Sequence, residues 1–170
     1  MILSPETIPT IYLKPGELYC AVTPTIVSTV LGSCVSITMH NPELRMSTIC
    51  HAVLPEELTS GDPCRYVDSS IIAMLRMFDR YGIKKKDLEV KLFGGSDMLP
   101  PSNNCFRKMT VGKQNILRSQ QIIEREQLNL LAYDVGGTHG RKLYFRTHTG
   151  EVFLKRLQTS GADPLMSRKN

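Results

Sequence analysis

Short runs in which apolar or β-branched residues alternate with polar ones predict that much of this chain is β structure. The predicted strands cover residues 10–22, 25–31, 34–39, 46–54, 88–93, 128–133, 141–147 and 151–157. A Pro15-Gly16 turn interrupts the first run, residues 40–44 form a turn around an Asn-Pro step, and the last two runs form a hairpin.

Two stretches have instead the three-to-four-residue apolar spacing of amphipathic helices. The first helix is expected to start with Asp62 as N-cap and Pro63 as first helical residue, and to end near Gly82. Its apolar positions are Val67, Ile71, Met74, Leu75 and Phe78. The second helix is expected over residues 111–126, with apolar contacts at Ile116, Leu117, Ile122 and Ile123.

Strands and helices follow one another without the regular β-α-β alternation of a doubly wound parallel sheet. The pattern therefore predicts an α+β fold: mixed, mainly antiparallel β-sheets packed with two amphipathic helices in a layered sandwich. A chain of 170 residues is long enough to bury a core of its own. We expect a single domain over residues 1–157 and a flexible tail over residues 158–170.

The charge balance changes this picture little. The chain has 21 basic and 16 acidic residues, and its one basic run, Lys84-Lys85-Lys86, is expected in a solvated loop. These features argue against a nucleic-acid partner and would suit an acidic protein partner. Residues 18–42 carry no Asp, Glu, Lys or Arg, but their prolines and β-branched residues favour buried strands over membrane insertion.

The five cysteines occupy positions 20, 34, 50, 64 and 105, and no two have the two-residue spacing of zinc or redox motifs. We therefore expect free thiols, no metal and no cofactor, in a reducing compartment. The N-terminus lacks the basic and apolar regions of a signal peptide, so a cytoplasmic protein is expected.

Cys34 stands out among these cysteines because it follows a Gly-Ser step between two apolar runs. Residue types alone leave two interpretations open: a buried packing residue, or a nucleophile presented at the end of a strand. In the second case His51, on the neighbouring strand, is the candidate base and is expected to hold the thiol as thiolate. Backbone N–H groups near Gly32 and Ser33 are candidate oxyanion donors.

The hydroxyls of Ser28 and Thr29, on the segment before Cys34, complete the candidate site. The remaining histidines are expected at surface turns; they are His40, His139 and His148. The glycine pairs at 94–95 and 136–137 match neither the dinucleotide fingerprint nor the Walker loop. They predict turns or a close approach of backbone to the site.

Four separate stretches carry a family resemblance. They are STVLGSCVSITMHNPELRMSTICHAVLP at 28–55, KLFGGSDML at 91–99, VGKQNI at 111–116 and YDVGGTHGRKLYFRTHTGEVFLKRL at 133–157. In order and spacing they resemble the CheD family, the chemoreceptor glutamine deamidases of bacterial chemotaxis. The resemblance covers residues 10–157.

The resemblance implies a cysteine hydrolase whose fold is related to the catalytic domain of the cytotoxic necrotizing factor toxins. By position, Cys34 matches the family's nucleophile and His51 its general base. The family's third polar residue lies six positions before the nucleophile, at Ser28 here, with Thr29 beside it. The implied substrates are glutamines of methyl-accepting chemotaxis receptors, and the CheC phosphatase is the implied protein partner.

Three other interpretations stay open. The first is another cysteine acyl-transfer enzyme, such as an amidase or a transglutaminase. The second is a non-catalytic chemotaxis adaptor that binds receptors or CheC. The third is a zinc site, for which the sequence supplies no closely spaced ligand pair.

Overall fold

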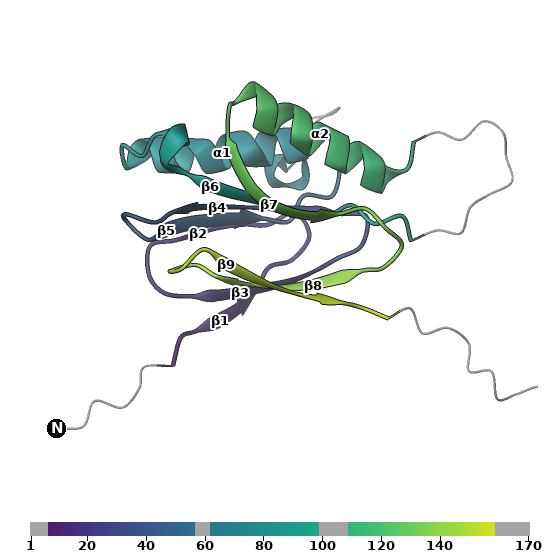
Figure 1. The fold of residues 1–170 in the computed structure, drawn as a ribbon, viewed down its shortest axis with the longest axis horizontal. Coiled ribbons are helices and arrows are strands. Elements are labelled where there is room, and N and C mark those ends of the chain that lie inside the picture. The colour runs from purple at the N-terminus through teal and green to yellow at the C-terminus, as the bar shows by residue number, and fades with distance from the viewer. Residues whose placement is uncertain (1–6, 57–61, 99–108, 159–170) are drawn as a thin grey trace, which may run out of the picture.

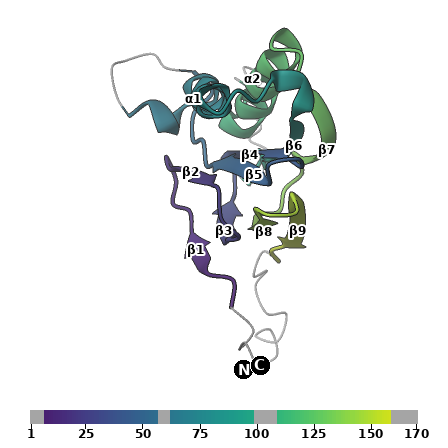
Figure 2. The same ribbon diagram turned by 90° about the vertical axis from the view of Figure 1, so that its left-hand side faces the viewer.

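The computed structural model describes residues 7–56, 62–98 and 109–158 and arranges them in three layers (Figure 1). Two helices cover one face of a five-stranded sheet, and a four-stranded sheet packs against the other face (Figures 1 and 2). The predicted α+β layered sandwich is confirmed. The expected loop at 96–108 and the tail at 158–170 lie almost wholly outside the described residues, as does Cys105.

The five-stranded sheet has the order β2-β5-β4-β6-β7 and the four-stranded sheet the order β1-β3-β8-β9. All neighbours are antiparallel except β1–β3 and β6–β7, which are parallel. The elements are β1 (Thr10–Tyr12), β2 (Leu18–Ala21), β3 (Ile26–Leu31), β4 (Val35–Asn41), β5 (Met46–Cys50), η1 (Pro63–Arg65), α1 (Val67–Arg80), η2 (Lys85–Asp87), β6 (Glu89–Gly94), α2 (Val111–Arg125), β7 (Asn129–Val135), β8 (Arg141–Arg146) and β9 (Glu151–Arg156).

Strand β4 lies in the centre of the five-stranded sheet and is buried on both faces. Its Val35, Ile37 and Met39 face the helices and join the largest apolar cluster of the protein. The alternate positions Ser36 and Thr38 are also buried, on the face turned toward the four-stranded sheet. The interior between the two sheets is therefore partly polar.

Three details of the predicted elements are wrong. Asp62 caps only the 3₁₀ turn η1, and helix α1 begins at Val67, four residues after the expected first residue Pro63, because Tyr66 has an extended backbone. Leu117 is exposed (44%), and the inward row of α2 is instead made by Gly112, Asn115, Ser119, Ile122 and Ile123. Strand β4 continues through His40, which the sequence placed at a turn.

Residues 18–42, the uncharged stretch, form β2, β3 and β4 rather than a helix. Across the three described ranges, none of the helices has the length and apolar character needed to cross a bilayer. Lys84, Lys85 and Lys86 are exposed around η2, as the sequence predicts.

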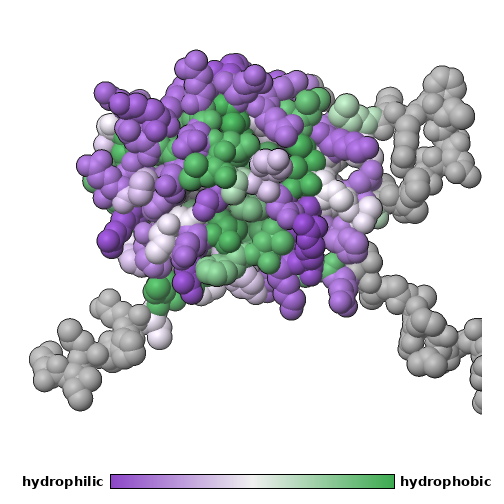
Figure 3. Space-filling model, viewed as in Figure 1, coloured by the Kyte–Doolittle hydropathy of each residue, from purple (hydrophilic) through white to green (hydrophobic). Residues whose placement is uncertain are grey.

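Figure 3 views the side of the molecule on which the edge strands β7 and β9 lie, and apolar side chains gather near its centre. Leu131 of β7 and Phe153 of β9 are each 50% exposed. Neither strand contains a cysteine or a histidine. The residues with acyl-transfer chemistry lie elsewhere, at the link between β3 and β4.

Replacing Phe78 by alanine should destabilise the fold strongly. The Phe78 ring of α1 is fully buried in the cluster between the helices and the five-stranded sheet. Truncating such a ring typically costs about 3–5 kcal/mol of unfolding free energy. Chemical denaturation should show this loss, whereas Leu117→Ala on the exposed face of α2 should change the unfolding free energy by roughly 0.5 kcal/mol or less. Similar losses for the two variants would contradict this assignment of the core.

Candidate active site

Residues 32–34 link β3 in one sheet to β4 in the other. The segment that follows β6 forms hydrogen bonds to the backbone of this link. The Ser96 N–H donates to the Gly32 carbonyl, and the Gly95 N–H donates to the Cys34 carbonyl, each at 2.8 Å. Cys34 itself is half-buried and packs beside the apolar cluster between the sheets. The link is therefore held in place by backbone hydrogen bonds, and Cys34 is only partly covered by the apolar cluster.

Gly94, the last residue of β6, makes this close approach possible. Its φ of +103° is a conformation that side chains disfavour. A Cβ atom at Gly94 would overlap the Cys34 carbonyl oxygen. The predicted close approach of the first glycine pair to the site is thus confirmed.

His51 directly follows β5, and both of its backbone polar groups are bound. Its N–H donates to the Glu17 carbonyl (2.9 Å), and its carbonyl accepts from the Gly16 N–H (2.8 Å). Its side chain is 1% exposed and reaches across to the other sheet, where Nδ1 lies 2.8 Å from Oγ1 of Thr29 on β3. The imidazole is therefore fixed at both its main chain and its ring.

The hydrogen bonds around Thr29 decide which ring nitrogen of His51 carries the proton. Thr29 Oγ1 lies 2.8 Å from the Leu13 carbonyl, which can only accept, so the Thr29 hydroxyl donates there. Its oxygen must then accept from His51, which makes Nδ1 the protonated nitrogen. His51 Nε2 is buried, has no partner among the described residues and presents a free lone pair. This is the tautomer that a general base acting through Nε2 requires.

The side chains of Ser28 and Thr29 point to opposite faces of strand β3, as expected for neighbours in a strand. The Ser28 hydroxyl donates to the Ile11 carbonyl at 3.3 Å and makes no bond to His51. The structure brings Thr29, rather than Ser28, to the imidazole. The position six residues before Cys34 points to the other face of the strand.

Cys34 and His51 face the same side of the five-stranded sheet. Val35 and Ala52 form a bridge with two backbone hydrogen bonds, of 3.0 and 2.9 Å, that extends the β4–β5 pairing beyond both strands. In that register Cys34 and His51 are diagonal neighbours. Such neighbours typically lie about 7–8 Å apart at the backbone, within reach of a long side chain. The expectation that adjacent antiparallel strands bring these two residues together is supported.

Burial favours the neutral form of both groups. It raises the pKa of the Cys34 thiol, against a smaller lowering by the Cys34 backbone N–H. It lowers the pKa of His51, against smaller raising effects of the Leu13 carbonyl and the Glu17 charge. The structure therefore points to a neutral thiol beside a neutral imidazole, and not to the standing thiolate that the sequence suggested.

Sequence reasoning missed Asn115, on the second turn of α2. Its side-chain Nδ2 donates to the carbonyls of Ser33 and Val53, each at 3.0 Å, and so joins the segments that carry Cys34 and His51. Asn115 is fully buried. The available signal was an amide within the inward row of an amphipathic helix, where an apolar residue is usual.

A second missed residue is Arg141, which is 1% exposed at the start of β8. It donates to Asp134 and Ser96 at 2.5 Å each and to the Gly136 carbonyl at 2.6 Å. These bonds fix both glycine-rich segments, of which Gly94-Gly95 lies against Cys34. The signal was an arginine in register with Leu143 and Phe145, the inward positions of the predicted strand.

The other histidines do not join this site. His40 is buried (4%) within β4, and its Nδ1 lies 2.8 Å from the Ser47 hydroxyl, so its expected surface position is wrong. His139 is exposed at a turn, and His148 is half-buried at another. The described residues contain no group of three or more His, Cys, Asp or Glu side chains that could hold a metal ion.

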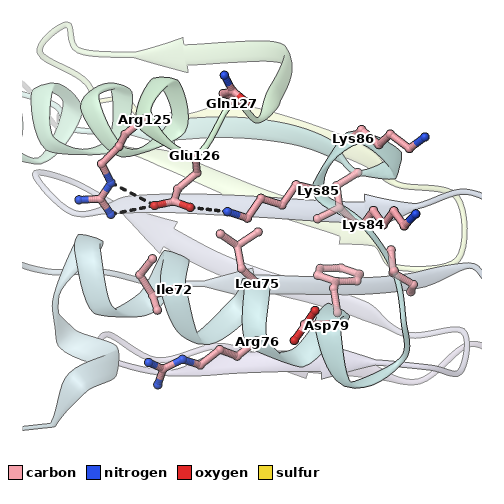
Figure 4. Close-up of a pocket in the computed structure, with 13 residues that line it drawn as sticks. Ile72, Leu75, Arg76, Asp79, Lys84, Lys85, Lys86, Arg125, Glu126 and Gln127 are labelled. Atoms are coloured by element: carbon pink, nitrogen blue, oxygen red, sulfur yellow. Dashed lines mark hydrogen bonds and ion pairs between the residues drawn. The ribbon is translucent and has the colours of Figure 1, made fainter.

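A hollow of about 720 Å³ lies away from Cys34, between the C-terminal ends of α1 and α2 (Figure 4). Lys85 and Arg125 both pair with Glu126 at its edge, at 2.5 and 3.0 Å. The described side chains that line it include no thiol, imidazole or hydroxyl. It therefore offers no acyl-transfer chemistry.

Comparisons with known proteins agree on one family. The family model "CheD chemotactic sensory transduction" matches residues 53–156. A probable chemoreceptor glutamine deamidase CheD 2 of Geobacter sulfurreducens is 53% identical over 156 residues, which cover 92% of this chain and 95% of that protein. A probable chemoreceptor glutamine deamidase CheD of Maridesulfovibrio salexigens is 42% identical and covers 87% and 92% of the two chains.

Proposed function

Because the chain belongs to the CheD family, we propose that it is an enzyme that deamidates glutamine side chains of chemoreceptors to glutamate. The names of its relatives support the activity. The observation that carries the mechanism is the orientation of His51, whose free Nε2 lone pair shares a sheet face with the Cys34 thiol. No cofactor or metal takes part in the proposed reaction.

Acylation is the first half of the proposed reaction. His51 Nε2 takes the Cys34 proton as sulfur attacks the carboxamide carbon of the glutamine, and the carbonyl electron pair moves to oxygen. Backbone N–H groups of the 32–34 link stabilise this oxyanion. His51 then gives its proton to the departing nitrogen, so that ammonia leaves and a γ-glutamyl thioester remains.

Hydrolysis completes the cycle. His51 Nε2 takes a proton from water, the hydroxide attacks the thioester carbon, and the Cys34 sulfur leaves and recovers the proton. The products are glutamate and free enzyme. Each turnover gives the receptor one more negative charge, which would alter the balance of repulsion between neighbouring helices.

The proposed partners are the cytoplasmic helices of methyl-accepting receptors and, by family resemblance, a CheC-type phosphatase. Both would be met in the cytoplasm. A non-catalytic adaptor would bind the same partners without using Cys34. The buried Thr29–His51 hydrogen bond favours the enzyme, because an adaptor gains nothing from an imidazole held in one tautomer.

The test is to incubate the purified protein with the cytoplasmic fragment of a chemoreceptor and to analyse receptor peptides by mass spectrometry. We expect specific glutamines to gain about 1 Da as amide becomes acid, with release of one ammonia for each. An added primary amine should not be incorporated, which distinguishes a deamidase from a transglutaminase. Binding of the fragment without modification would favour the adaptor.

Matched variants of Thr29 and Ser28 test which hydroxyl orients the His51 imidazole. Thr29→Val keeps the shape of the side chain but removes the bond to His51, so kcat should fall about 10-fold, the value of one hydrogen bond of roughly 1–1.5 kcal/mol. Thr29→Ser keeps the hydroxyl and should retain most activity. Ser28→Ala should change kcat little. A larger loss in Ser28→Ala than in Thr29→Val would reverse the assignment.

A further inference from the structure

The peptide bond between Ser33 and Cys34 is oriented by a side chain from another layer of the fold. Asn115 uses both Nδ2 hydrogens on carbonyl oxygens, those of Ser33 and Val53, at 3.0 Å each. Carbonyl oxygens only accept, so the amide of Asn115 cannot be flipped without losing both bonds. The direction of the Ser33 carbonyl is thereby set toward helix α2.

A planar trans peptide then fixes the neighbouring N–H. The carbonyl and N–H of one peptide unit point in opposite directions, so the Cys34 N–H points away from Asn115. Among the described residues it has no oxygen acceptor, and it lies toward its own thiol, whose pKa it lowers. An oxyanion that forms on a carbon bonded to this sulfur would lie beside an unused N–H donor.

Helix α2 packs unusually close to the segment after β6, and this packing places Asn115 beside Ser33. Gly112, one turn earlier on α2, lies so close to the Gly95 carbonyl that a Cβ atom would stand only 2.6 Å from it. The Asn115 Oδ1 atom is buried without a partner among the described residues. The site therefore keeps an amide whose donor end serves two carbonyls although its acceptor end is unpaired.

We propose that Asn115 is a positioning residue of the oxyanion site, which acts by holding the Cys34 N–H in the direction of the developing negative charge. The proposal builds on the thioester chemistry above. It gives helix α2 a part in the reaction although no atom of α2 touches the substrate carbonyl. It also assigns the Cys34 N–H, rather than the Ser33 N–H, as the donor that this side chain controls.

Two reactions of the Cys34 thiol show whether Asn115 positions the oxyanion donor or instead supports the thiol itself. Acylation by p-nitrophenyl acetate forms a C–S bond, passes through an oxyanion and expels p-nitrophenolate. Alkylation by iodoacetamide forms a C–S bond and expels iodide without any oxyanion. Both require an accessible thiol and the loss of its proton. A change in the ratio of their rates at Cys34 therefore reports on the oxyanion donors.

The experiment measures both rates in the full chain, with mass spectrometry of the peptide that contains Cys34, for wild type, Asn115→Ala and Asn115→Asp. Acylation should fall about 10²-fold, the scale of losing an oxyanion donor. Alkylation of Asn115→Ala should stay within about threefold, because the Cys34 N–H makes only the smaller contribution to the thiol pKa. Ser119→Ala, a buried polar residue one turn further along α2, should change neither rate.

Each outcome decides the proposal. A parallel fall of both rates would overturn it, because Asn115 would then support the thiol or the fold. Unchanged acylation would overturn it too. If Asn115→Ala and Asn115→Asp do not fold by circular dichroism, Asn115→Ser, which keeps one short donor, carries the same comparison. Acylation of wild-type Cys34 without activity on the receptor fragment would reject the receptor substrate while still testing Asn115.

Discussion

Cys34→Ala should abolish deamidation of a receptor fragment, with a loss of about 10⁴-fold or more in kcat, the scale of removing a nucleophile that acts together with its base. Among the described residues, no other thiol lies on the same sheet face as His51 and next to a backbone N–H without an acceptor. The variant should remain folded, because Cys34 is only half-buried and its sulfur fills little of the core. Release of ammonia and mass spectrometry of the receptor peptides measure the loss.

The matched control is Cys64→Ala, because Cys64 is also half-buried and free but lies in η1. Its activity should equal that of the wild type. Retained deamidation in Cys34→Ala would exclude Cys34 as nucleophile. If wild type and Cys34→Ala bind the receptor fragment equally and neither modifies it, Cys34 is a packing residue and the adaptor function replaces the enzyme.

His51→Gln should lower kcat/KM by about 10³-fold, within the range contributed by a positioned general base. Glutamine keeps a polar side chain in the buried site but cannot accept and return the Cys34 proton. His40→Gln is a suitable control. His40 is also buried and bound to a hydroxyl, but it lies six residues along β4 from Cys34, about 20 Å away at strand geometry. Equal losses in both variants would indicate a general effect on folding.

The pH dependence follows from the neutral Cys34–His51 pair. Because burial lowers the pKa of His51 from its ordinary value of 6.5, the acidic limb of kcat/KM should lie below pH 6.5. Because burial raises the pKa of Cys34, its alkylation rate should rise with pH to a midpoint above 9.0. A plateau of fast alkylation between about pH 6 and pH 8 would instead reveal a thiolate–imidazolium pair.

The same shift of His51 affects stability. Unfolding returns His51 to its ordinary pKa, so the unfolded chain binds more protons than the folded chain between the two values. The contribution of neutral His51 to the free energy of unfolding is therefore complete above pH 6.5. It is lost as the pH falls through the pKa of His51 in the folded protein. His51→Gln should show a shallower loss of stability in this acidic window.

The sequence by itself determined the strands and most of the helical limits. Alternation along β8 and β9 and the spacing of Val67, Ile71 and Phe78 are local, and each pattern has only one way to bury its apolar face. The sequence also determined the family, because several motifs keep their order and spacing. Cys34 and His51 were candidates from their positions alone, since a thiol after Gly-Ser and a histidine in an apolar strand both require explanation.

Only the tertiary structure decided how these residues are arranged. The choice of Thr29 over Ser28 depends on which face of β3 meets His51 across two sheets, and on the Leu13 carbonyl that fixes the proton. The neutral state of the pair depends on burial, which no local pattern reports. Asn115 is 81 residues after Cys34 in the chain, and its bond to Ser33 exists because α2 packs closely on the Gly95-Ser96 segment beside the link. Hydrogen bonds between distant segments are set by packing, so they become visible only when the layers are assembled.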